Sequence, residues 1–178
     1  MFLLDTNVVS ELRKRKPAPQ MMDWYTRQDA RDLWTTVITI FEIQIGIERA
    51  RRQHPGVAAD AERWLDNDVL PFFEGRILPL TLAASRLYGR MLTTPDLVNF
   101  VLRDPRSKKQ RTGADLMVAA IAVTEGATVV TRDTDDFRRI SQHFPLPGLL
   151  DPFQVPTSES GGPFERQTNE PFQLSQSL

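Results

Sequence analysis

Short apolar runs alternate with longer stretches of helical periodicity along the first 151 residues. The apolar runs, rich in β-branched and aromatic residues, predict strands at 2–5, 33–38, 76–80 and 127–131. The helical spacing of apolar residues predicts helices at 20–29, 39–54, 57–74, 81–92 and 114–126. Strands this apolar, separated by helices, favour a parallel sheet covered on both faces, so we expect a single α/β domain.

Residues 152–178 break this pattern. The segment contains four prolines, a glycine pair and many serine and glutamine residues, with neither a helical nor a strand period. Such a composition cannot bury enough apolar surface to order a chain by itself. We therefore expect a domain at 1–151 followed by a tail that is disordered or loosely attached.

The bulk composition is that of a soluble globular protein, with 40% hydrophobic and 25% charged residues. No apolar run approaches the roughly 18 residues of a membrane span, so we expect no membrane association. Asp5 interrupts the first apolar run and a basic cluster follows it, which is the reverse of a secretory signal, so the sequence predicts a cytoplasmic protein. The absence of cysteine excludes disulfides and thiolate metal sites. With a net charge of -1, any affinity for nucleic acid must come from local patches.

Four acidic residues fall at the ends of predicted strands or the starts of predicted helices. Asp5 ends the first strand, and Glu42 lies early in the helix that follows the second. Asp115 opens the alanine-rich helix, and Asp133 follows the last strand. Parallel sheets place their sites at the carboxyl ends of the strands, so we expect these acids to converge at one edge.

Helix capping offers a structural explanation for the same acids. Two pairs have the spacing of a capping box or its acidic variant, and a third has that of an N-cap with a first-turn acid: Thr39–Glu42, Thr112–Asp115 and Asp133–Asp136. Asp5 could be a turn residue, but no glycine or proline stands beside it. A carboxylate at the mouth of a buried strand needs a partner or a metal.

Several carboxylates without histidine or cysteine select hard cations such as Mg²⁺ or Mn²⁺. These cations favour phosphate substrates, because they activate water and stabilise the charge that develops during phosphodiester cleavage. The dipoles of the predicted helices would also keep Glu42 and Asp115 ionised, as a metal ligand must be.

Four motifs carry a resemblance to a known family. They are "LLDTNVVSE", "TTVITIFEIQIGIERA", "GADLMVAAIA" and "VVTRDTDDF". In this order they resemble the PIN-domain ribonucleases, specifically the VapC-type toxins of bacterial type II toxin–antitoxin pairs. The stretches "LLDTNVVSEL" and "FFEGRILPL" are most similar to the subgroup that includes the gonococcal trafficking toxin.

The resemblance implies a three-layer α/β/α sandwich around a central, mostly parallel sheet. It also implies an Mg²⁺- or Mn²⁺-dependent endoribonuclease in which the acids bind one or two metals and a metal-bound water attacks the RNA phosphodiester. The acids carried over are Asp5, Glu42, Asp115 and Asp133. The polar residues expected to orient them are Thr6, Asn7 and Thr131, with Asp136 as a further candidate. The implied partners are an RNA substrate, a second copy in a homodimer, and a small antitoxin that inserts an arginine or a helix into the acidic pocket.

Two basic clusters are candidate RNA contacts. Arg13 and Lys14 lie just beyond Asp5, and Lys108, Lys109 and Arg111 belong to the basic loop at 103–111. Basic residues can guide a phosphate backbone toward the acids, and charge runs are also common on solvated surfaces. Both interpretations remain open for each cluster.

Two other classes of function compete with the nuclease. A non-catalytic RNA-binding or interaction domain on the same fold would keep the acids mainly as caps, and the intact set of four argues against it. An aspartate-phosphorylated signalling domain usually needs a lysine at a late strand end, where this chain has Arg132. The metal-dependent toxin nuclease is therefore the leading hypothesis.

Overall fold

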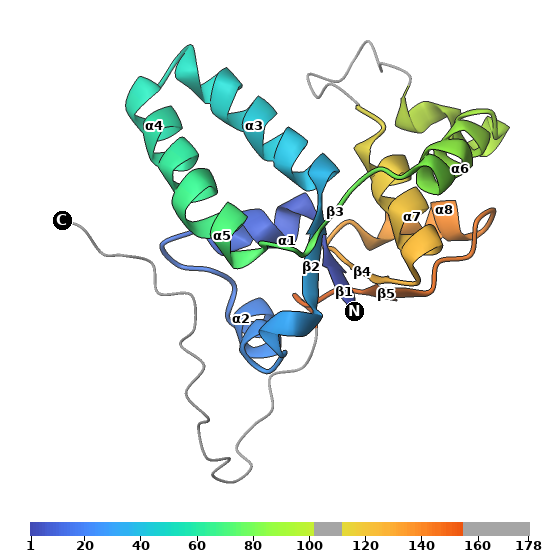
Figure 1. The fold of residues 1–178 in the computed structure, drawn as a ribbon, viewed down its shortest axis with the longest axis horizontal. Helices are drawn as coiled ribbons and strands as arrows, with labels where there is room; N and C mark the ends of the chain where they lie inside the picture. The colour runs from blue at the N-terminus through green and yellow to red at the C-terminus, as the bar shows by residue number, and fades with distance from the viewer. Residues whose placement is uncertain (102–111, 155–178) are drawn as a thin grey trace, which may run out of the picture.

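Five parallel strands form the centre of the fold in a computed structural model of the chain, which describes residues 1–101 and 112–154 (Figure 1). The strands are β1 (Phe2–Leu4), β2 (Leu33–Thr36), β3 (Ile77–Leu78), β4 (Thr128–Val130) and β5 (Gly148–Leu150). Their spatial order is β3-β2-β1-β4-β5, and every neighbouring pair is parallel. The four predicted strands and the parallel sheet are thus confirmed. The sequence pattern missed β5, which is short, half-buried and preceded by the proline-rich stretch 145–147.

Helices connect the strands. They are α1 (Thr6–Glu11), α2 (Pro19–Thr26), α3 (Val37–Arg51), α4 (Pro55–Trp64), α5 (Leu70–Phe72), α6 (Leu82–Leu92), α7 (Ala114–Glu125) and α8 (Thr134–Ser141). Two 3₁₀ segments, η1 (Ala30–Asp32) and η3 (Pro95–Phe100), and the π-helical segment η2 (Leu65–Val69) complete the described elements. No helix in the described part of the chain is long and apolar enough to cross a membrane.

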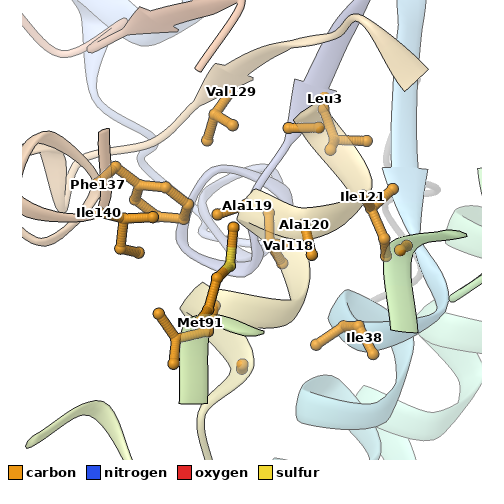
Figure 2. Close-up of a cluster of buried hydrophobic side chains, with 14 of the residues drawn as sticks. Leu3, Ile38, Met91, Val118, Ala119, Ala120, Ile121, Val129, Phe137 and Ile140 are labelled. Carbon is orange, nitrogen blue, oxygen red and sulfur yellow. The ribbon is translucent and has the colours of Figure 1, made fainter. Parts of the chain in front are cut away.

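Successive strand residues face opposite layers of helices. Leu3 and Val129 pack with residues of α6, α7 and α8, and Figure 2 shows both on the side of the sheet where Ala119 and Phe137 lie. Leu4 and Val130 belong instead to the cluster that includes α1, α2, α3 and α4. Strand side chains alternate between the two faces of a sheet, so apolar runs bury both faces. The expected three-layer α/β/α sandwich is confirmed.

The order of the strands reverses at β1. The chain moves outward from β1 through β2 to β3, and β4 then pairs with the opposite edge of β1. The register aligns Leu4 with Val130, so β1 and β4 end at the same level. The Asp5 N–H donates to the Val130 carbonyl at 3.0 Å. A sheet of this kind forms a crevice at such a switch point, beyond the carboxyl ends of the strands.

The helix caps differ from those that the sequence predicted. The Thr36 hydroxyl accepts from the Thr39 N–H at 3.1 Å, so α3 begins earlier and the Thr39–Glu42 capping box is wrong. Gly113, at φ 71°, is the N-cap of α7 and makes no side-chain cap, so the Thr112–Asp115 cap is also wrong. Asp133 does occupy the N-cap position of α8, but its side chain makes no capping hydrogen bond. Side-chain capping of a helix therefore accounts for none of the acids Glu42, Asp115 and Asp133.

The packed part of the chain continues a little beyond residue 151. Pro152 is buried, and Phe153 packs against the cluster on the α1–α4 side of the sheet. Most of the predicted tail, from residue 155 onward, lies outside the described residues, as do Lys108, Lys109 and Arg111.

Candidate active site

Asp5 follows β1 at the switch point and is only 4% exposed. As the N-cap of α1, its Oδ1 accepts from the Thr6 N–H at 2.7 Å. Its Oδ2 accepts from the Thr131 hydroxyl at 2.7 Å and from Asn7 Nδ2 at 2.9 Å. The local fold thus fixes the orientation of this carboxylate from both oxygens.

Thr131 and Asn7 connect Asp5 to the turn that carries Asp133. The Thr131 hydroxyl gives its single hydrogen to Asp5 and accepts from Asn7 Nδ2 at 2.9 Å and from the Asp133 N–H at 3.1 Å. A hydroxyl has one donor and two acceptor sites, so this group is fully used. Asn7 Nδ2 also approaches Asp133 Oδ2, at 3.4 Å, and its Oδ1 accepts from the Arg132 N–H at 3.1 Å.

Glu42 reaches the same edge of the sheet from α3. The Thr6 hydroxyl donates to its Oε2 at 2.6 Å, while the Thr6 backbone donates to Asp5. One residue thus holds two of the four acids, although Glu42 lies 36 positions away in the chain. Glu42 is half-buried, so part of its carboxylate remains accessible.

Asp115 lies half-buried in the first turn of α7. Burial first, and then the charges of nearby carboxylates, raise its pKa from 3.8 to about 7; these neighbours are Asp5, Asp136, Glu42 and Asp133. The expectation that the helix dipole keeps Asp115 ionised is therefore wrong for the metal-free chain. Burial likewise raises the pKa of Asp5 to about 6, against the opposing hydrogen bonds from Thr131 and Thr6 and with help from Glu42 and Asp133. Like charges raise a carboxyl pKa only when they lie close, so the four predicted acids do converge, and Asp136 lies near them.

The chemistry of this set fits a hard divalent cation. The groups gathered at the edge are carboxylates, hydroxyls and an amide, which are the ligands and supporting groups that Mg²⁺ and Mn²⁺ use. Among the described residues, no three acidic or histidine side chains form a ready-made metal-ligating cluster. Like-charged carboxylates repel one another, and a bound cation would remove that repulsion.

The basic residues near Asp5 have structural partners. Lys14 forms an ion pair with Glu11 at 2.7 Å, and the Arg13 guanidinium lies 5.9 Å from the centre of the Trp64 ring. Sequence reasoning missed Glu11, which is 4% exposed and contacts Arg132 as well as Lys14. An acid within "SELRKRK" reads as surface charge, because no apolar period marks it as buried.

Residues 2–142 match the family model of the PIN domain. The chain therefore belongs to the PIN-domain family. The resemblance stated from the four motifs is thus confirmed. The plasmid stability protein StbB of Pseudomonas syringae pv. tomato is 33% identical over 138 residues, which are 77% of this chain and 91% of that protein. The VapC ribonuclease Y4jK of Sinorhizobium fredii is 34% identical over 77% of this chain and 90% of its own length.

The subgroup suggested by the sequence is also represented. The toxin FitB of Neisseria gonorrhoeae is 29% identical over 137 residues, which are 77% of this chain and 91% of that toxin. The crystal structure of FitAcB from the same organism matches with a TM-score of 0.68 and 26% identity, covering 87% of this chain and 100% of the matched chain.

Proposed function

We propose that this protein is a metal-dependent endoribonuclease that acts in the cytoplasm as the toxin of a toxin–antitoxin pair. The observation that carries the proposal is the convergence of Asp5, Glu42, Asp115 and Asp133 from four separate segments at the switch point of the sheet. The names of two relatives, VapC ribonuclease Y4jK and toxin FitB, support the same class of activity.

The four acids would hold Mg²⁺ or Mn²⁺. A bound divalent ion supplies a Lewis acid that activates water and neutralises charge on the phosphate. Burial first, and then the charges of neighbouring carboxylates, raise the pKa values of Asp5 and Asp115. A bound cation would offset both effects, because it stabilises the ionised form of each carboxylate.

Thr6, Asn7 and Thr131 orient the acids. Thr6 holds the Glu42 carboxylate through its hydroxyl and the Asp5 carboxylate through its N–H. Thr131 and Asn7 both donate to Asp5 Oδ2, which leaves Oδ1 with a single protein donor. Partners of this kind typically change metal affinity or activity by about 10–100-fold when removed. Asp136, exposed in the first turn of α8, adds negative charge near Asp115.

The direct test is RNA cleavage by the purified full chain with Mn²⁺ or with EDTA. We expect cleavage that requires the metal and that disappears in Asp5→Asn. Asp135→Asn is the matched control, because Asp135 is a fully exposed acid whose ion pair is with Arg138. Cleavage that ignores EDTA or persists in Asp5→Asn contradicts the proposal and favours the non-catalytic interaction domain.

The antitoxin is proposed on two grounds. First, the FitAcB and FitAB structures that resemble this chain are toxin–antitoxin complexes. Second, an edge of the sheet that gathers several carboxylates suits a cationic side chain from a partner. Co-expression with a small DNA-binding protein encoded in the neighbouring reading frame should suppress both toxicity and cleavage. Growth arrest that co-expression of such a protein does not relieve argues against the toxin–antitoxin role. That result would not contradict the proposed nuclease activity.

A further inference from the structure

Glu11 is a buried acid outside the set of four. It ends α1 and is 4% exposed. Its Oε1 accepts from the Ala18 N–H at 3.0 Å, and its Oε2 accepts from Lys14 Nζ at 2.7 Å and Arg132 Nη2 at 3.2 Å. Burial alone would raise its pKa, but these contacts with Lys14, Ala18 and Arg132 bring the pKa below its ordinary value. The side chain is therefore an anion that organises three donors from different parts of the chain.

Arg132 is held on two sides. Glu11 accepts from its Nη2, and the Phe153 ring lies under its guanidinium with 3.7 Å between the guanidinium carbon and the ring centre. Stacking of arginine on an aromatic face adds to such an ion pair. The Phe153 N–H in turn donates to Asp151 Oδ1 at 2.9 Å, which fixes the start of the segment after β5. Glu11 and Phe153 thus restrain one guanidinium from the end of α1 and from beyond β5.

The backbone of Arg132 acts on the acid site. Its N–H donates to Asn7 Oδ1 at 3.1 Å. That bond decides which way the Asn7 amide points, because a rotated amide would set Nδ2 against the Arg132 N–H. In the observed orientation Nδ2 donates to Asp5 and Thr131. The position of the Arg132 backbone therefore affects the hydrogen bonding of Asp5 through the Asn7 side-chain amide.

We propose that Glu11 is a positioning residue for the acid site, which acts through Arg132 to hold the 131–133 turn and the Asn7 amide against Asp5. Its effect on cleavage rests on the proposed nuclease function, whereas its effect on Asn7 does not. None of the hydrogen bonds of Glu11 is to one of the four acids, and the proposed influence passes through Arg132 and Asn7.

Glu11→Gln places an amide NH₂ or carbonyl where Oε2 faced two cationic donors. Glutamine has one oxygen, so it cannot accept from the Ala18 N–H on one side and from Lys14 and Arg132 on the other. It also carries no charge, so its hold on the Arg132 guanidinium is weaker. We expect kcat to fall about 10-fold, at the lower end of the range for groups that orient ligands, with KM changed less than about 2-fold. Glu48→Gln is the matched control, because Glu48 also pairs with a basic residue three positions away but is exposed.

Arg132→Gln is the second variant, and we expect it to keep the fold even if Glu11→Gln unfolds. The Arg132 side chain is 48% exposed, and Glu11 retains Lys14 and the Ala18 N–H. Arg132→Lys should restore part of the activity, because a lysine can still pair with Glu11. Arg138→Gln, which alters an arginine in an exposed ion pair on α8, should change nothing.

A direct contact between Arg132 and an RNA phosphate would give a different result. Arg132→Gln would then raise KM and flatten its salt dependence, while Glu11→Gln would leave both unchanged. The positioning role instead requires the two variants to lower kcat alike. A shared KM effect without a kcat effect overturns it.

The deciding measurement is NMR of the metal-free full chain, which needs no enzymatic activity. Hydrogen exchange of the Asn7 side-chain amide and of the Arg132 N–H should accelerate at least about 5-fold in Arg132→Gln, if the side chain restrains the turn. Unchanged exchange rates overturn the proposal that Arg132 restrains the 131–133 turn and the Asn7 amide. Faster exchange with unchanged cleavage overturns its role in the reaction. If the wild-type protein cleaves no RNA with Mn²⁺, the nuclease proposal fails. The exchange rates still decide whether Arg132 restrains the Asn7 amide.

Discussion

Asp115→Asn should make the metal-free protein more stable while abolishing cleavage. Burial and the neighbouring carboxylates raise the pKa of Asp115 from 3.8 to about 7. At about 1.4 kcal/mol per unit, a shift of about three units sets an upper limit of about 4 kcal/mol on the cost of ionising this group in the folded state. Asparagine removes the charge with little change in shape. It loses about 0.5 kcal/mol of interaction with the α7 dipole and keeps some cost of amide burial. A net gain of about 2 kcal/mol remains, or about 4–8 °C in Tm.

The gain should depend on pH in a defined direction. The folded protein binds the Asp115 proton more tightly than the unfolded chain, because the folded pKa is raised. The stabilising contribution of this group is therefore complete below about pH 4 and is lost as the pH rises through about 7. The Tm difference between Asp115→Asn and wild type should be largest near pH 8.5 and should shrink steadily as the pH falls toward about 4.

Thermal unfolding by circular dichroism, with and without Mn²⁺, measures both effects. Mn²⁺ should raise the Tm of wild type near pH 8.5 and leave that of Asp115→Asn unchanged. Asp135→Asn is the control, because Asp135 also lies in the first turn of a helix but its side chain is 97% exposed. If Asp115→Asn is less stable than wild type near pH 8.5, as expected for a simple helix-start acid, the electrostatic reasoning is refuted.

Three further variants test other parts of the structure. Thr131→Val removes the hydroxyl that joins Asp5 to the 131–133 turn, and RNA cleavage with Mn²⁺ should fall about 10–100-fold; an unchanged rate argues against an orienting role. Gly113→Ala forces a left-handed residue and brings its Cβ to 2.7 Å from Val101, so urea unfolding should show a loss of about 2 kcal/mol; a loss below about 0.5 kcal/mol contradicts this. Thr36→Ala removes the α3 cap and should cost about 1 kcal/mol in the same assay, whereas a neutral result rejects Thr36 as the cap.

The strands and the four acids were readable in advance. Apolar runs such as 2–4 and 128–130 predict strands buried on both faces, and the family motifs mark the acids that follow them. Short elements were harder. The helix α1 has six residues, among them β-branched Thr6, Val8 and Val9, so propensity does not favour it. It forms because Asp5 caps its start and because Val8 and Val9 are buried.

Local register was beyond the sequence as well. Thr36 and Thr39 are both plausible caps for α3, and only the end of β2 at Thr36 decides between them. A capping motif records spacing along the chain, whereas the first residue of a helix depends on where the preceding strand stops pairing.

The sequence by itself determined the class of fold and pointed to the four acids as candidates, because strand alternation, helical periodicity and short motifs are properties of neighbouring residues. Only the tertiary structure decided how those acids are held. Thr131 donates to Asp5 across 126 positions, and Arg132 meets Glu11 across 121. Such contacts leave no period in the chain, because each depends on one side chain that reaches another after the sheet has formed. From the sequence, the charge of Glu11 indicates a solvated surface residue. In the folded chain, packing buries it as an anion beside the site.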